Sequence, residues 1–162
     1  MLVSGNTEEA NCRPCTPGYF CDGVGLVRET GLCAPGFYCP EGQSTDSPQD
    51  YICPRGFECP VGSAEPLVCA RGYYQEDMNQ PDCDLCPSGK YCDPFELSNV
   101  TGVITPENCP MGYYCPFGTE FALQNPCEAG TFGNTTQLTS QGLLKYFKSK
   151  KDTKKNYKLF CS

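Results

Sequence analysis

The sequence has no histidine and no tryptophan among its 162 residues. Without histidine, the Ser-His-Asp and Cys-His nucleophile systems are excluded, together with every zinc site that uses an imidazole ligand. Leucine, isoleucine, valine and phenylalanine make up less than a fifth of the chain, and no run approaches the roughly 20 apolar residues of a membrane-spanning helix. We therefore expect no enzyme, no catalytic residue, no cofactor, no metal and no large hydrophobic core.

Cysteine is abundant by contrast, with 15 copies in the chain. A chain so poor in apolar residues, with a net charge of −7, would normally be disordered. This cysteine content is instead typical of small folds in which disulfides replace the apolar core. Disulfides persist in oxidising compartments, so the sequence indicates a secreted protein or an ectodomain. The first residues have neither the basic region nor the apolar stretch of a signal peptide, which favours a fragment or a variant transcript of a longer protein.

One seven-residue motif, Cys-x-x-Gly-x-x-Cys, recurs along the chain. Five copies are complete: Cys15–Cys21, Cys33–Cys39, Cys53–Cys59, Cys86–Cys92 and Cys109–Cys115. Two further copies begin at Cys69 and Cys127 but have Gln75 and Gly133 in place of the second cysteine. Repetition at short intervals is typical of a tandem array in which each unit is stabilised by its neighbours.

The repeat has a second level, because residues 11–22 align with residues 82–93 and each segment begins with an extra cysteine, Cys12 or Cys83. This predicts four regions. A leader without a signal peptide covers 1–11, a first cysteine-rich block covers 12–82, a truncated second block covers 83–141, and a basic tail outside the repeat covers 142–162.

Proline and glycine at fixed offsets after cysteine favour a tight turn in each copy. Any strands should be short two-stranded hairpins, which need covalent support in water. We therefore predict a small disulfide-rich fold, an elongated tandem array of loops and short β-hairpin modules with little helix. We expect aromatic residues at the recurring positions to pack over the disulfides, although contact with a ligand is an alternative. They are Tyr19, Phe37, Phe57, Tyr73, Tyr91, Tyr113 and Phe132.

The segment from Cys69 to Cys86 carries Cys-x-x-Gly-x-Tyr followed by Cys-x-x-Cys. It resembles the ephrin-receptor-like cysteine-rich repeat, and it is also similar to the first module of tumour-necrosis-factor-receptor cysteine-rich domains. The resemblance implies a Cys69–Cys83 disulfide, three bridges among the six cysteines from Cys15 to Cys59 and two among the four from Cys86 to Cys115. The twelve cysteines expected in disulfides are Cys15, Cys21, Cys33, Cys39, Cys53, Cys59, Cys69, Cys83, Cys86, Cys92, Cys109 and Cys115.

This expected pairing does not include Cys12 and Cys127. By the same pattern, Cys12 would pair with a cysteine upstream of this chain. Cys127 would pair about 14 residues on, but position 141 is Gln. Cys161 is then either free or bonded to Cys127.

The composition also changes after residue 141. Residues 142–162 hold seven lysines and one aspartate, whereas acidic residues outnumber basic ones 18 to 5 before them. We expect this tail to be foreign to the repeat, for example a translated intron or an alternative terminal exon. The alternative is a basic tail that binds acidic surfaces.

Other candidate sites are weaker. The Cys12/Cys15 and Cys83/Cys86 pairs could form a four-cysteine zinc site, but their separation makes module junctions the better interpretation. Glu76, Asp77, Asp82 and Asp84 form an acidic loop without the register of a calcium site, so we expect a solvated loop. Asn99 and Asn134 begin glycosylation sequons and should carry glycans if the chain is secreted.

The function that we expect is a structural spacer or protein-interaction stalk within a large extracellular repeat protein. The alternative is a ligand-binding ectodomain fragment of a cell-surface receptor. The expected partners are extracellular proteins and not nucleic acid, and any membrane contact would come through a segment of the parent protein. These functions rest on analogy at the level of the fold.

Overall fold

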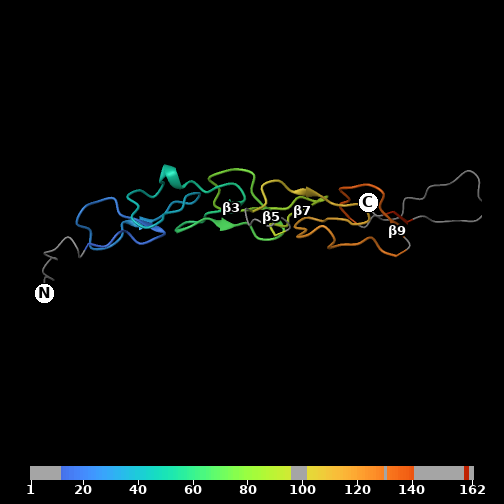
Figure 1. Ribbon diagram of the computed structural model, residues 1–162, viewed down its shortest axis with the longest axis horizontal. Helices are drawn as coiled ribbons and strands as arrows, with labels where there is room; N and C mark the ends of the chain where they lie inside the picture. The colour runs from blue at the N-terminus through green and yellow to red at the C-terminus, as the bar shows by residue number, and fades with distance from the viewer. Residues whose placement is uncertain (1–11, 96–101, 130, 141–158, 161–162) are drawn as a thin grey trace, which may run out of the picture. The chain divides into compact units, whose positions relative to one another are not determined.

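The computed structural model describes residues 12–95, 102–129, 131–140 and 159–160 (Figure 1). Several sequence expectations lie outside these residues: the leader at 1–11, Asn99, Cys161 and the tail at 142–162 apart from residues 159–160. Within them, the helical structure is one 3-10 turn, η2 (Gln49–Tyr51). We number the seven motif copies as modules 1 to 7, beginning at Cys15, Cys33, Cys53, Cys69, Cys86, Cys109 and Cys127.

Every strand in the described residues is two residues long, and the strands drawn in Figure 1 are accordingly short arrows. The strands are β1 (Tyr19–Phe20), β2 (Gly31–Leu32), β3 (Phe57–Glu58), β4 (Leu67–Val68), β5 (Tyr73–Tyr74), β6 (Asp84–Leu85), β7 (Lys90–Tyr91), β8 (Glu107–Asn108), β9 (Thr131–Phe132) and β10 (Leu159–Phe160). They form two-stranded sheets β1–β2, β3–β4, β5–β6, β7–β8 and β9–β10.

The pairing follows one rule along the repeat. The strand inside a module pairs with the residues directly before the first cysteine of the next module, as in the antiparallel pairs Tyr19↔Leu32 and Tyr73↔Leu85. In modules 2 and 6 the pairing shrinks to single antiparallel bridges, Phe37↔Ile52 and Tyr113↔Pro126. The strands β9 and β10 depart from the rule because they run parallel. The prediction of a small disulfide-rich fold with short hairpins and little helix is confirmed.

The chain divides into two compact units. The first comprises Met1–Pro54, Glu58–Leu67 and Met78–Asp82, and the second comprises Arg55–Phe57, Val68–Asp77 and Cys83–Ser162. Modules 1 and 2 belong to the first unit, modules 5 to 7 belong to the second, and the residues of modules 3 and 4 are divided between them.

The buried hydrophobic residues of the described chain are cysteines and Leu138. Nine of the motif cysteines have no exposed surface: Cys33, Cys39, Cys53, Cys59, Cys69, Cys86, Cys92, Cys109 and Cys115. Of the recurring aromatics, Tyr19 and Tyr73 are 39% and 40% exposed, Phe37, Phe57, Tyr91 and Tyr113 are half-buried, and the side chain of Phe132 lies outside the described residues. Their packing over the disulfides stays a prediction. A two-residue strand at the edge of a narrow module has too little neighbouring structure to cover a large ring completely.

Candidate functional site: the backbone ladder

Each module opens with the same tight turn. In module 1 the Tyr19 N–H donates to the Thr16 carbonyl at 3.0 Å, and in module 5 the Lys90 N–H donates to the Pro87 carbonyl at 3.2 Å. The motif glycine occupies the third position of the turn. In the six modules where it is described, its φ lies between 80° and 84°. This is the left-handed conformation that a type II turn requires and that glycine adopts without steric cost.

The turn places the glycine backbone against the next module. The glycine N–H donates to the carbonyl of the second-cysteine position of that module, at 2.7–3.0 Å. The six acceptors are Cys39, Cys59, Gln75, Cys92, Cys115 and Gly133, for the donors Gly18, Gly36, Gly56, Gly72, Gly89 and Gly112. In return, the first cysteine of each following module donates its N–H to the same glycine's carbonyl, as from Cys33 to Gly18 at 2.9 Å. We call this repeating set of inter-module hydrogen bonds the backbone ladder.

A second turn, directly after the motifs of modules 3 and 6, adds two more bonds to the ladder. The Gly62 N–H donates to the Cys33 carbonyl at 2.9 Å, and the Gly118 N–H donates to the Cys86 carbonyl at 2.9 Å. The carbonyls of the next residues, Ser63 and Thr119, accept from Cys39 and Cys92 at 2.8 and 3.0 Å. The repeated contacts show that these turns are part of the ladder.

Two non-glycine residues stand where other modules use glycine in the second turn. Asn79 and Gln137 both have φ of 63°, and their N–H groups donate to the carbonyls of Cys53 and Cys109 at 2.8 and 2.9 Å. Asparagine tolerates this left-handed conformation better than most residues, whereas glutamine has no such advantage. Gln137 therefore indicates that the inter-module bond holds the backbone in this conformation.

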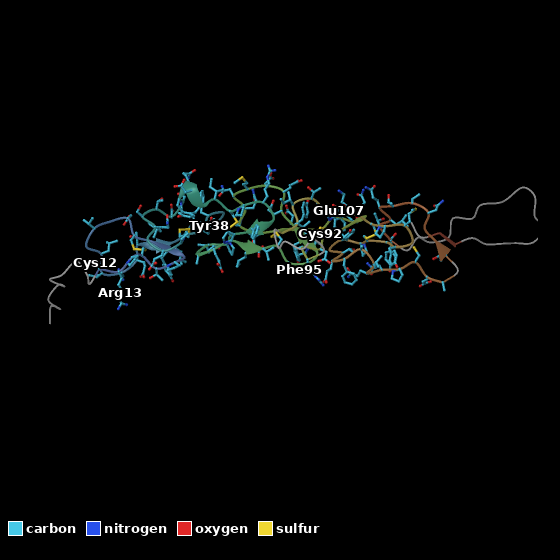
Figure 2. All side chains as sticks on the ribbon, viewed as in Figure 1. Cys12, Arg13, Tyr38, Cys92, Phe95 and Glu107 are labelled. Carbon is cyan, nitrogen blue, oxygen red and sulfur yellow. A yellow bond between two sulfur atoms is a disulfide. The ribbon has the colours of Figure 1, made fainter. Side chains whose placement is uncertain are left out.

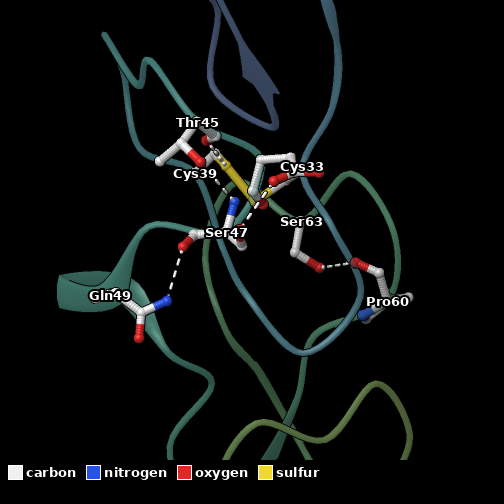
Figure 3. The surroundings of a disulfide bond; sticks show 8 residues. Cys33, Cys39, Thr45, Ser47, Gln49, Pro60 and Ser63 are labelled. Atoms are coloured by element: carbon white, nitrogen blue, oxygen red, sulfur yellow. Dashed lines mark hydrogen bonds between the residues drawn. A yellow bond between two sulfur atoms is a disulfide. The ribbon is translucent and has the colours of Figure 1, made fainter. Parts of the chain in front are cut away.

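Side-chain hydroxyls support the same turns. The Ser63 Oγ donates to the Pro60 carbonyl at 2.7 Å beside the Cys33–Cys39 disulfide (Figure 3). Thr119 does the same with the Pro116 carbonyl, also at 2.7 Å, and both hydroxyl residues are buried. In Figure 3 the Gln49 amide also donates to the Ser47 carbonyl, at 3.1 Å. The Ser/Thr after Pro-x-Gly is thus a structural position that the sequence analysis missed.

The motif glycine also contacts the module after next. A Cβ added to Gly18 would lie 2.5 Å from the Gly62 carbonyl oxygen, and one added to Gly72 would lie 2.7 Å from that of Gly118. Gly36 and Gly89 have the same relation to the carbonyl oxygens of Asn79 and Gln137, at 2.6 and 2.9 Å. No side chain fits at these distances. Two separate constraints therefore require glycine here: the positive φ, and the close approach of a carbonyl oxygen to the position that a Cβ would occupy.

Six disulfides have both cysteines within the described residues (Figure 2). Five join the two cysteines of one motif across six residues: Cys15–Cys21, Cys33–Cys39, Cys53–Cys59, Cys86–Cys92 and Cys109–Cys115. The sixth joins Cys69 to Cys83 across 14 residues. The structure thus brings together all twelve cysteines that the sequence analysis placed in disulfides.

Module 4 has Gln75 where the five complete modules have a second cysteine. Gln75 is 3% exposed, and its Oε1 accepts from the Asp77 N–H at 3.0 Å. In module 4, a hydrogen bond between Gln75 and the Asp77 N–H therefore lies at the position where the five complete modules have a disulfide.

Cys12 and Cys127, which the expected pairing did not include, differ in their bonding. Cys12 is free and exposed, at the start of the described chain beside Arg13 (Figure 2). Cys127 is disulfide-bonded, which excludes a free thiol at this position. Cys161, the partner that the sequence offers for it, lies outside the described residues.

The other candidate sites can be placed as follows. Cys15, Cys83 and Cys86 are in disulfides and cannot serve as thiolate zinc ligands. Within the described part of the chain, no group of three or more acidic, cysteine or histidine side chains could hold a metal ion, and the acidic loop is solvated. Asn134 is exposed, as glycosylation requires.

The electrostatics of the surface are local. A hydrogen bond from the Thr16 hydroxyl, at 2.5 Å, lowers the pKa of the exposed Glu29 carboxyl. Partial burial raises the pKa of Tyr74, with smaller contributions from Glu76 and Asp84. Arg71 pairs with Asp93 at 3.3 Å and stacks on the Phe95 ring, with 5.1 Å to its centroid. The Arg71 side chain is 46% exposed and the Asp93 side chain is 12% exposed, so the pair is partly shielded from water. None of the described helical structure is long or apolar enough to span a membrane.

The comparisons with known proteins point to transporters. The chain is similar to the ABC-type transporter claG of Penicillium crustosum, with 43% identity over 49 residues, or 30% of this chain and 6% of that protein. It is also similar to ABC transporter G family member 25 of Oryza sativa subsp. japonica, with 29% identity over 137 residues, or 82% of this chain and 12% of that protein. No protein-family profile matches the chain. The chain thus spans at most 12% of the length of these curated relatives.

Proposed function

We propose that this chain is an extracellular, disulfide-bonded repeat segment of a larger protein and acts as a structural spacer or protein-interaction stalk. The observation that carries the proposal is the backbone ladder. It repeats the same bonds between successive modules, in described residues whose buried hydrophobic side chains are cysteines and one leucine.

The cysteines support the extracellular setting. Thirteen of the described cysteines are disulfide-bonded, and nine of them are completely buried. Few other side chains are buried, so a reducing compartment would remove most of what holds the fold. A location in the secretory pathway or outside the cell is the setting in which these bonds persist.

The transporter comparisons support a position within a larger membrane protein. The rice relative aligns with 82% of this chain but extends far beyond it. A spacer segment attached to a transporter is consistent with that proportion. Transport, its substrates and its partners would then belong to the parent protein, and this chain would supply an extracellular module array.

A ligand-binding role is the second candidate, and one surface favours it. The loop after module 6 exposes Phe117, Phe121 and Leu123, at 69%, 40% and 60%. Exposed apolar side chains close together in sequence are typical of protein-binding surfaces. In this alternative, the segment would recognise an extracellular protein through that loop.

Disulfide mapping of the protein from its natural source tests the proposal. The protein is alkylated before extraction, digested without reduction and analysed by mass spectrometry. We expect the six disulfides in peptide pairs and a glycan on the Asn134 peptide. Recovery of the twelve paired cysteines in alkylated form would contradict the extracellular assignment, because it would show that they are thiols in place.

Cell binding separates the spacer from the ligand-binding candidate. The secreted chain is fluorescently labelled and applied to cells of its source. Saturable binding that is lost in a Phe117→Ser, Leu123→Ser variant, but kept in the exposed control Val61→Ser, supports recognition through the module 6 loop. A spacer predicts no saturable binding by any of the three proteins.

A further inference from the structure

Two apolar surfaces of the same construction occur in the repeat, and the first lies in module 1. Tyr19 and Leu32 are cross-strand partners, and such partners present their side chains on the same face of a sheet. The Leu32 Cδ2 lies 3.0 Å from the position that a Cβ on Gly62 would occupy, so the turn after module 3 packs beside this pair. Val61 directly precedes Gly62 in that turn. We call Tyr19, Leu32 and Val61 the module 1 patch.

The second surface repeats this arrangement three modules further along the chain. Tyr73 and Leu85 are cross-strand partners. The Leu85 Cδ1 lies 3.1 Å from the Cβ position of Gly118, and Phe117 stands where the first surface has valine. We call Tyr73, Leu85 and Phe117 the module 4 patch. Each patch lies entirely within one of the two compact units.

The two patches are exposed to the same degree. The fractions are 39% and 40% for Tyr19 and Tyr73, 47% for both Leu32 and Leu85, and 60% and 69% for Val61 and Phe117. Modules 1 to 3 precede the module 4 patch, and modules 4 to 7 follow the module 1 patch. The shared exposure is therefore a property of the repeat, independent of the ends of the sequence. Apolar surface that recurs at equivalent positions is typical of a binding surface.

Module 2 shows that the fold does not require such a patch. The bridge partners Phe37 and Ile52, which correspond to the tyrosine and leucine of the patches, are half-buried. Met78 directly precedes the left-handed Asn79 of the turn that faces this module, and it is 52% exposed. Met78 is thus an exposed apolar turn residue without an exposed cross-strand pair beside it.

Carboxylates flank the module 1 patch. Glu65 lines the same hollow as Val61. Glu29 accepts a hydrogen bond from the Thr16 hydroxyl, and the Thr16 carbonyl in turn accepts from the Tyr19 N–H. Both sides of the patch therefore carry negative charge.

The module 4 patch also has a carboxylate beside it. The Glu120 Cγ lies 3.4 Å from the Cβ position of Gly72, which precedes Tyr73. The nearby Arg71 is already paired with Asp93, at 3.3 Å. In the part of the chain that the structure describes, neither Glu120 nor the two carboxylates of the module 1 patch form an ion pair. Their charge is available to a partner.

We propose that the two patches are equivalent binding sites for an extracellular protein that presents apolar side chains flanked by lysine or arginine. Burial of the apolar side chains supplies affinity, and the flanking carboxylates select a basic rim. The same carboxylates repel an anionic membrane and a second copy of this acidic surface. This inference rests on the proposed role as a protein-interaction stalk and names the chemistry of the partner.

The geometry predicts two weak sites on each chain. A patch of three side chains buries far less than the roughly 1,200–2,000 Å² of a stable interface. A partner that carries two such apolar and basic elements would gain from binding both patches at once. A single short peptide should therefore bind each patch weakly and independently.

Nuclear magnetic resonance titration of the full, oxidised chain tests the proposal. The probe is a short synthetic peptide of alternating lysine and leucine, and the matched control peptide has glutamate in place of lysine. The lysine peptide should shift the amide signals of both patches, less strongly at high salt. The glutamate peptide should shift neither.

Three variants locate the binding. Val61→Ser should weaken binding at the module 1 patch about fivefold and leave the module 4 patch unchanged, and Phe117→Ser should do the reverse. Met78→Ser removes an equally exposed apolar residue and should change neither site. The disulfide map checks that each variant is folded.

Equal binding of the two peptides would overturn the proposal, as would equal weakening by Met78→Ser or no shifts at either patch. Binding to phosphatidylserine vesicles that is lost in the Val61→Ser and Phe117→Ser variants would overturn it in favour of a lipid surface. In each case the disulfide mapping of the natural protein is unaffected, so failure of the patches is distinguishable from failure of the proposed extracellular spacer.

Discussion

Modules 2 and 4 use the same turn but close it with different covalent bonds. Module 2 joins Cys33 to Cys39 within the motif, whereas module 4 joins Cys69 to a cysteine 14 residues on and has Gln75 in the motif. The glycine N–H of both modules nevertheless donates to the next module, at 2.8 and 2.9 Å. The acceptor is a backbone carbonyl, which every residue type provides. The comparison teaches that the glycine turn is fixed while the position of the second sulfur can vary.

Removing either disulfide should clearly lower the free energy of unfolding of the chain. The Cys69→Ser, Cys83→Ser variant lacks the bridge that closes the loop between these residues in the unfolded state, and it should lose about 3 kcal/mol of unfolding free energy. The Cys33→Ser, Cys39→Ser variant removes the bridge of a shorter loop and should lose about 2.5 kcal/mol. Denaturant unfolding under oxidising conditions measures both. Unchanged stability in either variant would show that the ladder does not depend on that bridge.

The glycines provide the next test. Gly36→Ala places a methyl group 2.6 Å from the Asn79 carbonyl oxygen at φ of 84°, and should cost roughly 2–5 kcal/mol. Gly112→Ala is the matched control, because it has the same backbone conformation and nothing described within 4 Å. It should cost only the backbone term, about 1–2 kcal/mol. Equal losses, measured in dilute solution, would contradict a role for the close approach.

Moving the disulfide partner of Cys69 from position 83 to position 75 should change the free energy of unfolding less. In a Gln75→Cys, Cys83→Ser variant, we expect a disulfide between Cys69 and the sulfur introduced at position 75, because the backbone of module 4 already forms the same turn. Its stability should fall by about 1–2 kcal/mol, from the shorter closed loop and the lost Gln75–Asp77 hydrogen bond. Non-reducing peptide mapping identifies the bridge. Unpaired thiols at positions 69 and 75 would indicate that module 4 differs from module 2 in more than its sulfur.

The smallest effect concerns pH. The hydrogen bond from Thr16 lowers the folded-state pKa of Glu29. The stabilisation is therefore fully present above the unfolded pKa and is lost as the pH falls through the folded value. Thr16→Val should flatten the decline in stability below about pH 4.5, the ordinary pKa of the group. Because Glu29 is exposed, the change should be close to the limit of detection, and a large change would contradict this assignment.

The sequence predicted the modules well because their signals are local. Cysteine spacing and the recurring glycine were sufficient for the turns, the short strands and the absence of a large core. The contacts between a glycine and the module after next could not be predicted, since Gly18 and Gly62 are far apart in sequence and only the folded backbone brings them together. Asn79 and Gln137 were missed for the same reason, because nothing local marks them as equivalents of glycine.

The recurrence of the aromatic positions predicts a shared role but not how deeply each ring is buried. Tyr19 and Tyr73 occupy the same place in their modules, on two-residue strands, with about two-fifths of their surface exposed. Recurrence reflects the repeating backbone geometry, and burial depends on how many neighbours a small module can supply.

Hydrogen exchange at the motif glycines tests the backbone ladder most directly. Gly56 and Gly112 donate to Gln75 and Gly133, whereas Gly18 and Gly36 donate to second cysteines. If the ladder is independent of the second sulfur, all four amides should exchange far more slowly than in an unstructured peptide. Protection of Gly18 and Gly36 alone, with Gly56 and Gly112 exchanging at the peptide rate, would contradict the account and show that the disulfides hold each module separately.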